Sequence, residues 1–343
     1  MFAFVLANLW ALRQVNALAD SGANHQVRNL NFGVSGSNVN DASNSFCCGG
    51  TLGSLVQDSS GKQYILSNNH VLARSGVAKV GDNIAQPGLI DNFCRAAETV
   101  ANFTVAPKLG SNVDAAIAEL VPGKMKSDGS IEDIGTISSI LRTPSVGLSV
   151  AKSGRTTGLT TGSISSTNTS VSVQYQEGCG KGRKFTVSYT NQVVVSGNSF
   201  SAGGDSGSLI VTNDGAHQPV GLLFAGSKTS TIANPIQSVV TQVSSALGST
   251  VSFVGGTAVS TQSSPTQPSI QSILNVNNTH GRRADALMRA PGIIGVGIGV
   301  SDDGTEAALV VYVNGNAARR PNLPNRIDGA LVKVVNTDEF VAY

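Results

Sequence analysis

One short stretch of the sequence holds residues that could supply a nucleophile. Residues 199–211 read SFSAGGDSGSLIV, with Ser206 between Asp205 and Gly207 just before an apolar run. A serine hydroxyl is a poor nucleophile at neutral pH, so it needs a base in contact with it, a carboxylate that orients the base, and donors for the oxyanion. The alternative is that the stretch is only a turn that enters a strand.

The sequence has four histidines that could act as the base, and their contexts differ. His25 lies in a polar stretch and His217 lies at a hairpin turn. His280 follows a polar linker. His70 directly follows an apolar strand in QYILSNNHVLA. Because a strand end can hold a side chain rigidly beside a cleft, we predict that His70 is the base.

A carboxylate that orients the histidine should be buried. Asp114, in SNVDAAIAEL, comes directly before an apolar strand-like run and meets this expectation. Other acids lie in loop-like contexts and fit less well, namely Asp82, Asp91 and Asp133. The three predicted groups therefore follow one another along the chain as His70, Asp114 and Ser206.

The sequence around these residues predicts a β-rich fold. Of the 343 residues 39 are glycine, and charged residues make up 13%, about half the usual share. Short alternating runs separated by turn signals predict hairpins, and their density favours an all-β barrel or sandwich. In NPIQSVVTQVSSALG, an apolar stripe predicts one helix with Asn234 as N-cap, Pro235 at the first helical position, and Gly248 at the end.

The sequence divides into four segments. Residues 1–29 are an N-terminal segment, 30–256 the domain with the predicted site, 257–271 a polar linker, and 272–343 a small α+β module. In that module HGRRADALMRAPG predicts a short helix, GIIGVGIGV and AALVVYV a hairpin closed by SDDG, and ALVKVV a strand. The alternating glycines are not a dinucleotide loop, because Val300 stands where GxGxxG needs its third glycine.

Charge and hydropathy exclude several classes of partner. A net charge of +2 creates no large field that would select nucleic acid, and the basic loop GKGRK is most simply a solvated hairpin tip. No apolar run reaches the roughly 18 to 20 residues needed to cross a bilayer. The first residues fit either an imperfect export signal, with Arg13 out of place, or an amphipathic helix. A secreted or periplasmic location and a cytoplasmic one both remain open.

The four cysteines lack the paired spacing of a zinc site. They form up to two disulfides or are reduced and buried, and the sequence does not determine their pairing. These residues are Cys47, Cys48, Cys94 and Cys179.

Three motifs in order resemble those of chymotrypsin-like (trypsin-like) serine peptidases: CGGTLGSLV leading to LSNNHVL, then VDAAIA, then GGDSGSLIV. LSNNHVL and AKSGRTTGLTTGSI resemble a bacterial trypsin-like subgroup. The resemblance covers residues 30–250. An α/β-hydrolase is disfavoured, because Ser208 stands where GxSxG needs its last glycine and no βα alternation flanks the motif.

The resemblance implies an all-β fold of two six-stranded barrels with a C-terminal helix. It also implies a serine endopeptidase that acts on protein or peptide substrates without metal or cofactor. Ser206 would attack the acyl carbon, His70 would carry the proton, and Asp114 would orient the imidazole. The N–H groups of Gly204 and Ser206 would form the oxyanion hole. The substrate pocket would be lined by Phe200, Phe224, Ala225 and Gly226.

Two positions depart from the family pattern. No basic residue followed by an apolar-Val-Gly-Gly start occurs in the first fifty residues, so Asp205 is paired within the chain or exposed. Phe200 stands where an acid would select Lys or Arg, which predicts a preference for uncharged side chains. A catalytically silent binding or scaffold protein is the alternative function, and docking of the 272–343 module on the barrels is a further hypothesis.

Overall fold

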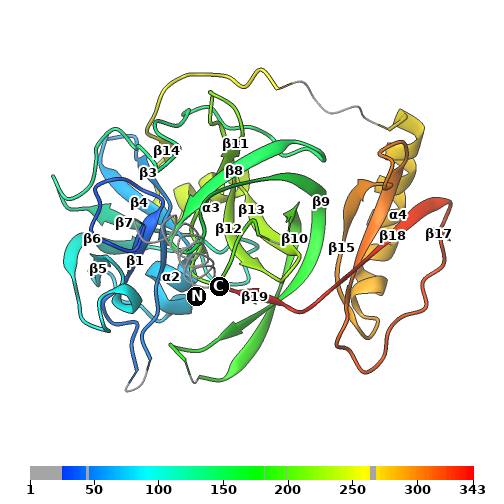
Figure 1. Cartoon of the computed structure of the whole chain (residues 1–343), viewed down its shortest axis with the longest axis horizontal. Helices are drawn as coiled ribbons and strands as arrows, with labels where there is room; N and C mark the ends of the chain where they lie inside the picture. The colour runs from blue at the N-terminus through cyan, green and yellow to red at the C-terminus, as the bar shows by residue number, and fades with distance from the viewer. Residues whose placement is uncertain (1–24, 44–45, 181, 198, 263–267) are drawn as a thin grey trace, which may run out of the picture.

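The computed structural model describes residues 25–43, 46–180, 182–197, 199–262 and 268–343, so the predicted N-terminal segment lies almost wholly outside the described residues. The described residues form a barrel-like sheet early in the chain and a second one after it (Figure 1). The first sheet has eight strands among the described residues, in the order β14-β3-β4-β7-β6-β5-β1-β2. Their bounds are β1 Val34–Asn38, β2 Gly50–Leu52, β3 Ser54–Gln57, β4 Gln63–Ser67, β5 Asn83–Gln86, β6 Glu98–Val105, β7 Ala116–Leu120 and β14 Ser252–Phe253.

The second sheet begins as the second barrel and then runs into the module. Its order among the described residues is β10-β13-β12-β11-β8-β9, followed by strands from beyond residue 290. The barrel strands are β8 Ser149–Gly154, β9 Gly158–Gln176, β10 Lys184–Ser196, β11 Leu209–Thr212, β12 Pro219–Gly226 and β13 Ser230–Pro235. The mostly β architecture predicted from the hairpins is confirmed, and so are the two barrels that the resemblance implied.

The two barrels touch where the run TLGSLV is interrupted. Gly53 separates β2 from β3, and a Cβ there would overlap the carbonyl oxygen of Gly207. Gly207 itself has φ +95, and a Cβ on it would overlap the Thr51 carbonyl oxygen and the Ser67 hydroxyl. Only glycine permits so close an approach of two backbones. The segment that carries Ser206 is thereby held directly against the first barrel.

The predicted helix after the second barrel is α3, Ile236–Leu247, and it ends at Gly248 with φ +74, a left-handed cap. The expected N-cap was wrong by one position. Pro235 is the N-cap, and Asn234 is the last but one residue of β13. The side chain of Asn234 turns inward and takes buried partners, as described below, so it does not cap the helix.

The remaining helices among the described residues are α2 Asn69–Leu72, the 3-10 turns Arg74–Gly76 and Leu89–Asp91, and α4 Ile270–Met288. The predicted short helix of the module is longer than expected. α4 begins at Ile270, inside the predicted linker, because Ser269 caps it by accepting a hydrogen bond from the Ser272 N–H.

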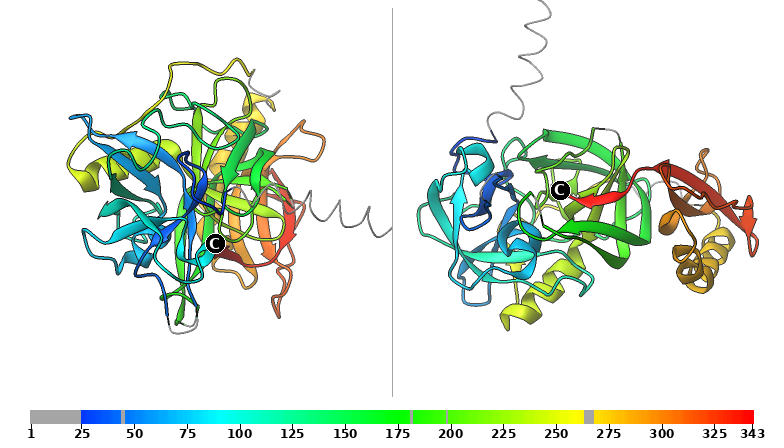
Figure 2. Two further views of the ribbon diagram at one scale, coloured as in Figure 1. Left: turned by 60° about the vertical axis from the view of Figure 1, so that its left-hand side comes forward. Right: turned by 90° about the horizontal axis from the view of Figure 1, so that it is seen from below.

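The module is a small sheet covered by α4 (Figures 1 and 2). The predicted hairpin is present as β15 and β16, closed at residues 301–306, and β18 lies parallel to β16. β15 also pairs antiparallel with β9, so the barrel sheet continues into the module without a break. The strands are β15 Ile293–Val300, β16 Ala307–Asn314, β17 Arg326–Ile327, β18 Ala330–Thr337 and β19 Phe340–Ala342.

All four cysteines form disulfides. Cys47 pairs with Cys94 within the first barrel, and Cys48 pairs with Cys179 at the tip of the β9–β10 hairpin. The second bridge therefore ties the two barrels together. Arg183, in the predicted solvated tip, is 77% exposed, while Lys181 lies outside the described residues. Within the described part of the chain, no helix is long and apolar enough to cross a membrane.

Candidate active site

His70 and Asp114 meet between the two barrels. β4 ends at Ser67, and α2 then turns His70 toward the start of β7, where Asp114 is fully buried. The His70 Nδ1 atom lies 2.6 Å from Asp114 Oδ2, and the His70 backbone N–H donates to Asp114 Oδ1 at 3.2 Å. This pair is the one expected from the strand-end positions of the two residues. The carboxylate fixes the imidazole with its second nitrogen toward the cleft.

Three further residues position Asp114, and no motif in the sequence pointed to them. The Tyr175 hydroxyl donates to Asp114 Oδ2 at 2.8 Å, and it lies 2.6 Å from the Tyr189 hydroxyl. The Asn234 side-chain oxygen accepts from the Asp114 backbone N–H at 2.9 Å. The one sequence signal for the tyrosines is the alternation of the β9–β10 hairpin, which places both on its buried face. A buried carboxylate needs such partners to stay charged.

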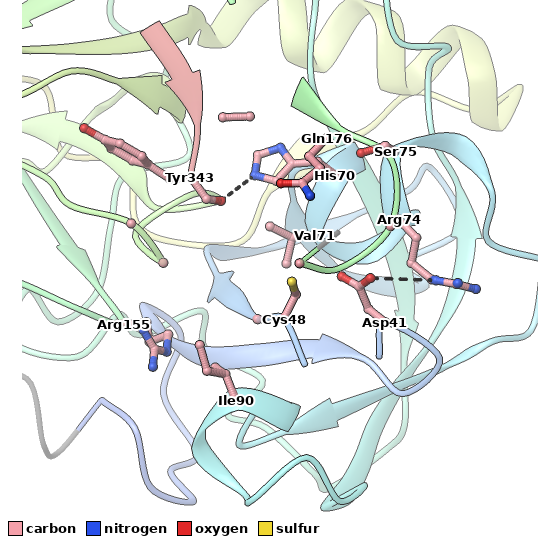
Figure 3. Close-up of a pocket in the computed structure, with 16 residues that line it drawn as sticks. Asp41, Cys48, His70, Val71, Arg74, Ser75, Ile90, Arg155, Gln176 and Tyr343 are labelled. Carbon is pink, nitrogen blue, oxygen red and sulfur yellow. Dashed lines mark hydrogen bonds and ion pairs between the residues drawn. The ribbon is translucent and has the colours of Figure 1, made fainter. Parts of the chain in front are cut away.

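Ser206 lies on the loop between β10 and β11 and is fully buried. Its Oγ donates to the backbone carbonyl of Phe224 at 3.1 Å. His70 Nε2 has another partner, the Tyr343 carbonyl oxygen at 3.0 Å (Figure 3). Among the described residues, His70 Nε2 is therefore bonded to the Tyr343 backbone oxygen and not to Ser206 Oγ, the partner that a catalytic pair would require. Hydrogen bonds in such sites often tighten only in the substrate complex.

These contacts favour the protonated form of His70. Burial opposes the charged imidazolium, but the Asp114 carboxylate, the Tyr343 carbonyl oxygen and the nearby Asp41 together raise the pKa of His70 above its usual value. With both ring nitrogens donating, the imidazole has no free lone pair to accept a proton. A histidine in this state must lose its Nε2 proton before it can act as a base.

Asp205 is paired within the chain, which was one of the two alternatives that the sequence left open. Its carboxylate lies 3.7 Å from the Lys152 ammonium, and both side chains are fully buried. It also accepts hydrogen bonds from the N–H groups of Thr156 and Thr157, the Thr157 hydroxyl and the Ala202 N–H. The segment GRTTG, residues 154–158, therefore fixes the acid beside Ser206.

A second network links this segment to the glycine turn before Ser206. Arg155 binds Asp91 through two hydrogen bonds of 2.6 Å and donates to the Thr156 hydroxyl at 2.9 Å. The Thr156 hydroxyl donates to the Gly203 carbonyl at 2.7 Å. Gly204 has φ +99, and a Cβ on it would crowd Thr156 and Arg155. The turn can therefore take this shape only with glycine.

The four predicted pocket residues lie in different environments. Phe200 is buried in an apolar cluster, and Tyr343 packs against that cluster. Phe224 and Ala225 belong to another cluster, in which the Phe224 ring lies 4.9 Å from the Tyr189 ring centroid. β12 therefore presents its backbone to the cleft at these positions. At Gly226, a Cβ would overlap the Tyr343 hydroxyl.

The other histidines and acids have structural partners. His25 is buried and bonds to the Gly33 carbonyl and to Asp133. His280 bonds to the Val296 carbonyl within the module. His217 lies in the turn between β11 and β12, and Asp82 accepts from Asn38. The side-chain partners described for His25, Asp82 and His280 are other than His70, Asp114 and Ser206.

A cavity of about 300 Å³ opens beside His70 (Figure 3). Tyr343 lies at one side of it and the Arg74–Asp41 pair at the other, with 3.9 Å between the charged atoms, and Gly204 also lines it (Figure 3). Burial raises the pKa of Asp41 to about 6, although Arg74 opposes this shift. The cavity also borders the Cys48–Cys179 bridge. The cavity therefore extends from Tyr343 and His70 to Asp41 and Arg74.

Comparisons with known proteins found a family model that matches part of the chain and similar solved structures. A protein-family model described as the Nal1 C-terminal domain matches residues 95–244. A comparison with curated proteins gives no match.

Three solved proteases are similar to part of this chain. Thermobifida fusca protease A is 19% identical and covers 66% of this chain and 99% of its own, with a TM-score of 0.44. Nocardiopsis protease (NAPase) is 17% identical, with coverages of 62% and 95% and a TM-score of 0.42. A glutamic acid-specific serine protease is 21% identical, with coverages of 65% and 98% and a TM-score of 0.44. The chain's own sheets form the two barrels that the resemblance implied, whereas the chymotrypsin-like family and its bacterial subgroup stay predictions.

Proposed function

We propose that this protein is a serine endopeptidase. The observation that carries the proposal is the buried Asp114 carboxylate that holds His70 beside a cavity, which Gly203 and Gly204 of the Ser206 loop also line. A carboxylate-oriented imidazole next to a serine on a glycine turn is the arrangement that acyl transfer needs. The role of each residue below is part of this proposal.

In the first step, His70 Nε2 takes the proton of Ser206 Oγ as the oxygen attacks the peptide carbonyl carbon. The tetrahedral intermediate then collapses, the C–N bond breaks, and His70 gives the proton to the leaving amine. Water next attacks the carbonyl carbon of the acyl-enzyme while His70 takes one of its protons. The ester bond to Ser206 then breaks, His70 returns the proton to Ser206 Oγ, and the acid product leaves. Asp114 stays ionised throughout and stabilises the imidazolium.

The oxyanion of both intermediates would accept from the N–H groups of Gly204 and Ser206. The networks of Asp205 and Arg155 support this assignment, because they fix the turn from both sides. Donors that are held before the reaction cost no reorganisation, and each is worth on the order of 10²-fold in rate.

The pocket supports a preference for uncharged side chains. Phe200 and its apolar neighbours form its inner wall, and the nearby Asp205 is already bound by Lys152 and four hydrogen-bond donors. A Lys or Arg side chain would therefore enter without a carboxylate partner, which is costly for a buried charge.

The test is labelling with a fluorophosphonate probe, which reacts with activated serines. We expect the unmodified chain to be labelled, and we expect Ser206→Ala and His70→Ala to abolish labelling while circular dichroism shows that both variants are folded. A folded chain that remains unlabelled, including after displacement of Tyr343 from the cleft, would favour the catalytically silent scaffold.

The dependence of the peptidase rate on pH above neutrality gives an independent prediction. Burial lowers the pKa of Lys152 to about 8, although Asp205 opposes this shift. Above that pH Lys152 becomes neutral, Asp205 loses its cation, and we expect peptidase activity to decline. Lys152→Arg should move the decline to higher pH, because arginine stays charged. Rates measured between pH 6 and 10 check both.

Loss of stability would not explain this decline. In the unfolded chain the pKa of Lys152 lies near the ordinary lysine value of 10.5, so between about pH 8 and 10.5 the unfolded state binds more protons than the folded state. Folding stability from this group alone therefore rises with pH in that window. A thermal melt that falls in step with activity would contradict this explanation.

A further inference from the structure

The segment Phe340–Tyr343 lies in the cleft as an extended strand. β19 leaves the module and crosses to the centre of the molecule between the barrels (Figures 1 and 2). Ala342 pairs with Ala225 and Val341 with Gly226, antiparallel to β12. On its other edge β19 pairs in parallel with β9. An added strand of this kind binds through its backbone, while pockets read alternate side chains.

The Tyr343 side chain enters the pocket. Its ring packs against the apolar cluster that contains Phe200, and its hydroxyl donates to the Ser227 carbonyl at 3.1 Å. The absence of a Cβ at Gly226 makes room for that hydroxyl. Burial raises the pKa of the Tyr343 phenol. A large, neutral, aromatic side chain with one polar end thus fits this pocket.

The Tyr343 carbonyl lies at the reacting end of the cleft. Its oxygen is 3.0 Å from His70 Nε2, and Tyr343 and Ala342 also line the cavity that holds Asp41 and Arg74. Any residue attached to this carbonyl would continue into that cavity. The segment therefore occupies one half of the cleft and leaves the other half open.

We propose that the cleft recognises the chain's own Phe340–Tyr343 as a substrate segment, with Tyr343 before the cleaved bond. The segment then remains as a tethered occupant. This inference rests on the proposed peptidase function and deepens it. It names the substrate class as peptides with an aromatic residue before the scissile bond and an extended, apolar stretch preceding it.

Contacts just before β19 hold the segment in register. The Thr337 hydroxyl lies 2.6 Å from the Ser227 hydroxyl, and Asp338 accepts from the Lys228 N–H at 3.2 Å. Phe340 is 1% exposed and packs on Tyr312 at 5.7 Å between ring centroids. The segment of residues 340–343, which we call the tail, is thus anchored on both the barrel turn and the module, and removal of Ala342 and Tyr343 alone keeps the buried Phe340 in place.

The decisive experiment extends the full chain after Tyr343 with a fluorescent protein and follows its release by mass spectrometry. Ser206 would attack the Tyr343 carbonyl, the bond to the next residue would break, and His70 would protonate the released amine. Water would then free the Tyr343 carboxylate. We expect one cut, directly after Tyr343, at a rate independent of protein concentration.

Matched variants of the same fusion separate recognition from folding. Ser206→Ala should leave the fusion intact, and Tyr343→Phe should be cut like the parent. Tyr343→Lys should be cut at least about 100-fold more slowly, because its charge would be buried without a partner. Equal cutting of the Lys and Tyr forms would overturn the proposed selectivity.

Probe labelling of the same proteins distinguishes the two levels of failure. If Ser206 is labelled and no cut occurs after Tyr343, the peptidase proposal stands and the tail inference is wrong. If neither labelling nor cutting occurs in the fusion or in a chain without Ala342 and Tyr343, the peptidase proposal itself fails and the inference fails with it.

The occlusion by the tail is tested on the chain without Ala342 and Tyr343, which keeps the Phe340 anchor. We expect Ser206 labelling to be about tenfold faster or more, since a tethered ligand raises local concentration strongly. Equal labelling rates would overturn occlusion. Gly226→Val should keep the strand but shift cleavage of peptide amides from tyrosine to alanine before the bond, because its side chain fills the place of the Tyr343 hydroxyl.

Discussion

Asp114→Asn should lower kcat by about 10⁴-fold with little change in KM. In the native chain Asp114 Oδ2 accepts from His70 Nδ1 and from the Tyr175 hydroxyl. An amide NH₂ group turned toward His70 would need Nδ1 as acceptor, so the ring proton would move to Nε2. Nε2 could then no longer accept the Ser206 proton. Steady-state kinetics on a peptide amide, with the tail truncated, measure the change.

Tyr175→Phe is the matched control for this prediction. It removes one hydrogen bond to the same carboxylate oxygen and one with the buried Tyr189 hydroxyl, but it leaves the histidine tautomer unchanged. We expect a loss of only about tenfold or less, in line with a single hydrogen bond to a charged group. A result in which Asp114→Asn and Tyr175→Phe cost the same would show that Asp114 does not set the tautomer.

Lys152→Met should destabilise the fold by about 3 kcal/mol and reduce activity more than a surface substitution would. It leaves the buried Asp205 carboxylate without its cation, and breaking one partner of a buried pair costs about 3 to 5 kcal/mol. Thr156, Thr157 and Ala202 still donate to Asp205, which places the loss at the lower end of that range. Denaturant unfolding and probe labelling give the two readouts.

The double variant Lys152→Met with Asp205→Asn provides the second half of this test. Because it removes both charges, most of the lost stability should return, and the two effects should be strongly non-additive. Activity should recover less than stability, since the amide does not reproduce all the bonds that fix the Gly203–Gly204 turn. Additive losses in the double variant would mean that the two side chains act independently.

Local patterns in the sequence predicted the barrels and the meeting of His70 with Asp114. His70 follows one apolar strand and Asp114 precedes another, and the ends of neighbouring strands lie close together at one edge of a sheet. The hairpin of β15 and β16 was also visible, because its apolar alternation and its turn residues are adjacent in the chain.

The other features of the candidate site depend on contacts between segments that are distant in the sequence, and local patterns do not show such contacts. Lys152 gives no sign that it is buried, because an exposed lysine in an alternating strand looks the same. Asn234 before Pro235 has the pattern of a helix cap, yet its side chain is taken by Asp114 and Gln192. The pairing of residues 341–342 with β12 joins segments more than a hundred residues apart, and residues 340–343 gave no sign that they reach the cleft.

The continuous sheet from β9 through β15 to the module has a consequence for inhibition measurements. It ties Phe340–Tyr343 to the cleft, so the tail acts as a competitor at a fixed local concentration, about millimolar for a short tether. Dilution does not lower that concentration. Peptide inhibitors titrated against the full chain should therefore show weaker apparent affinity than against the truncated chain, by one constant factor for all of them.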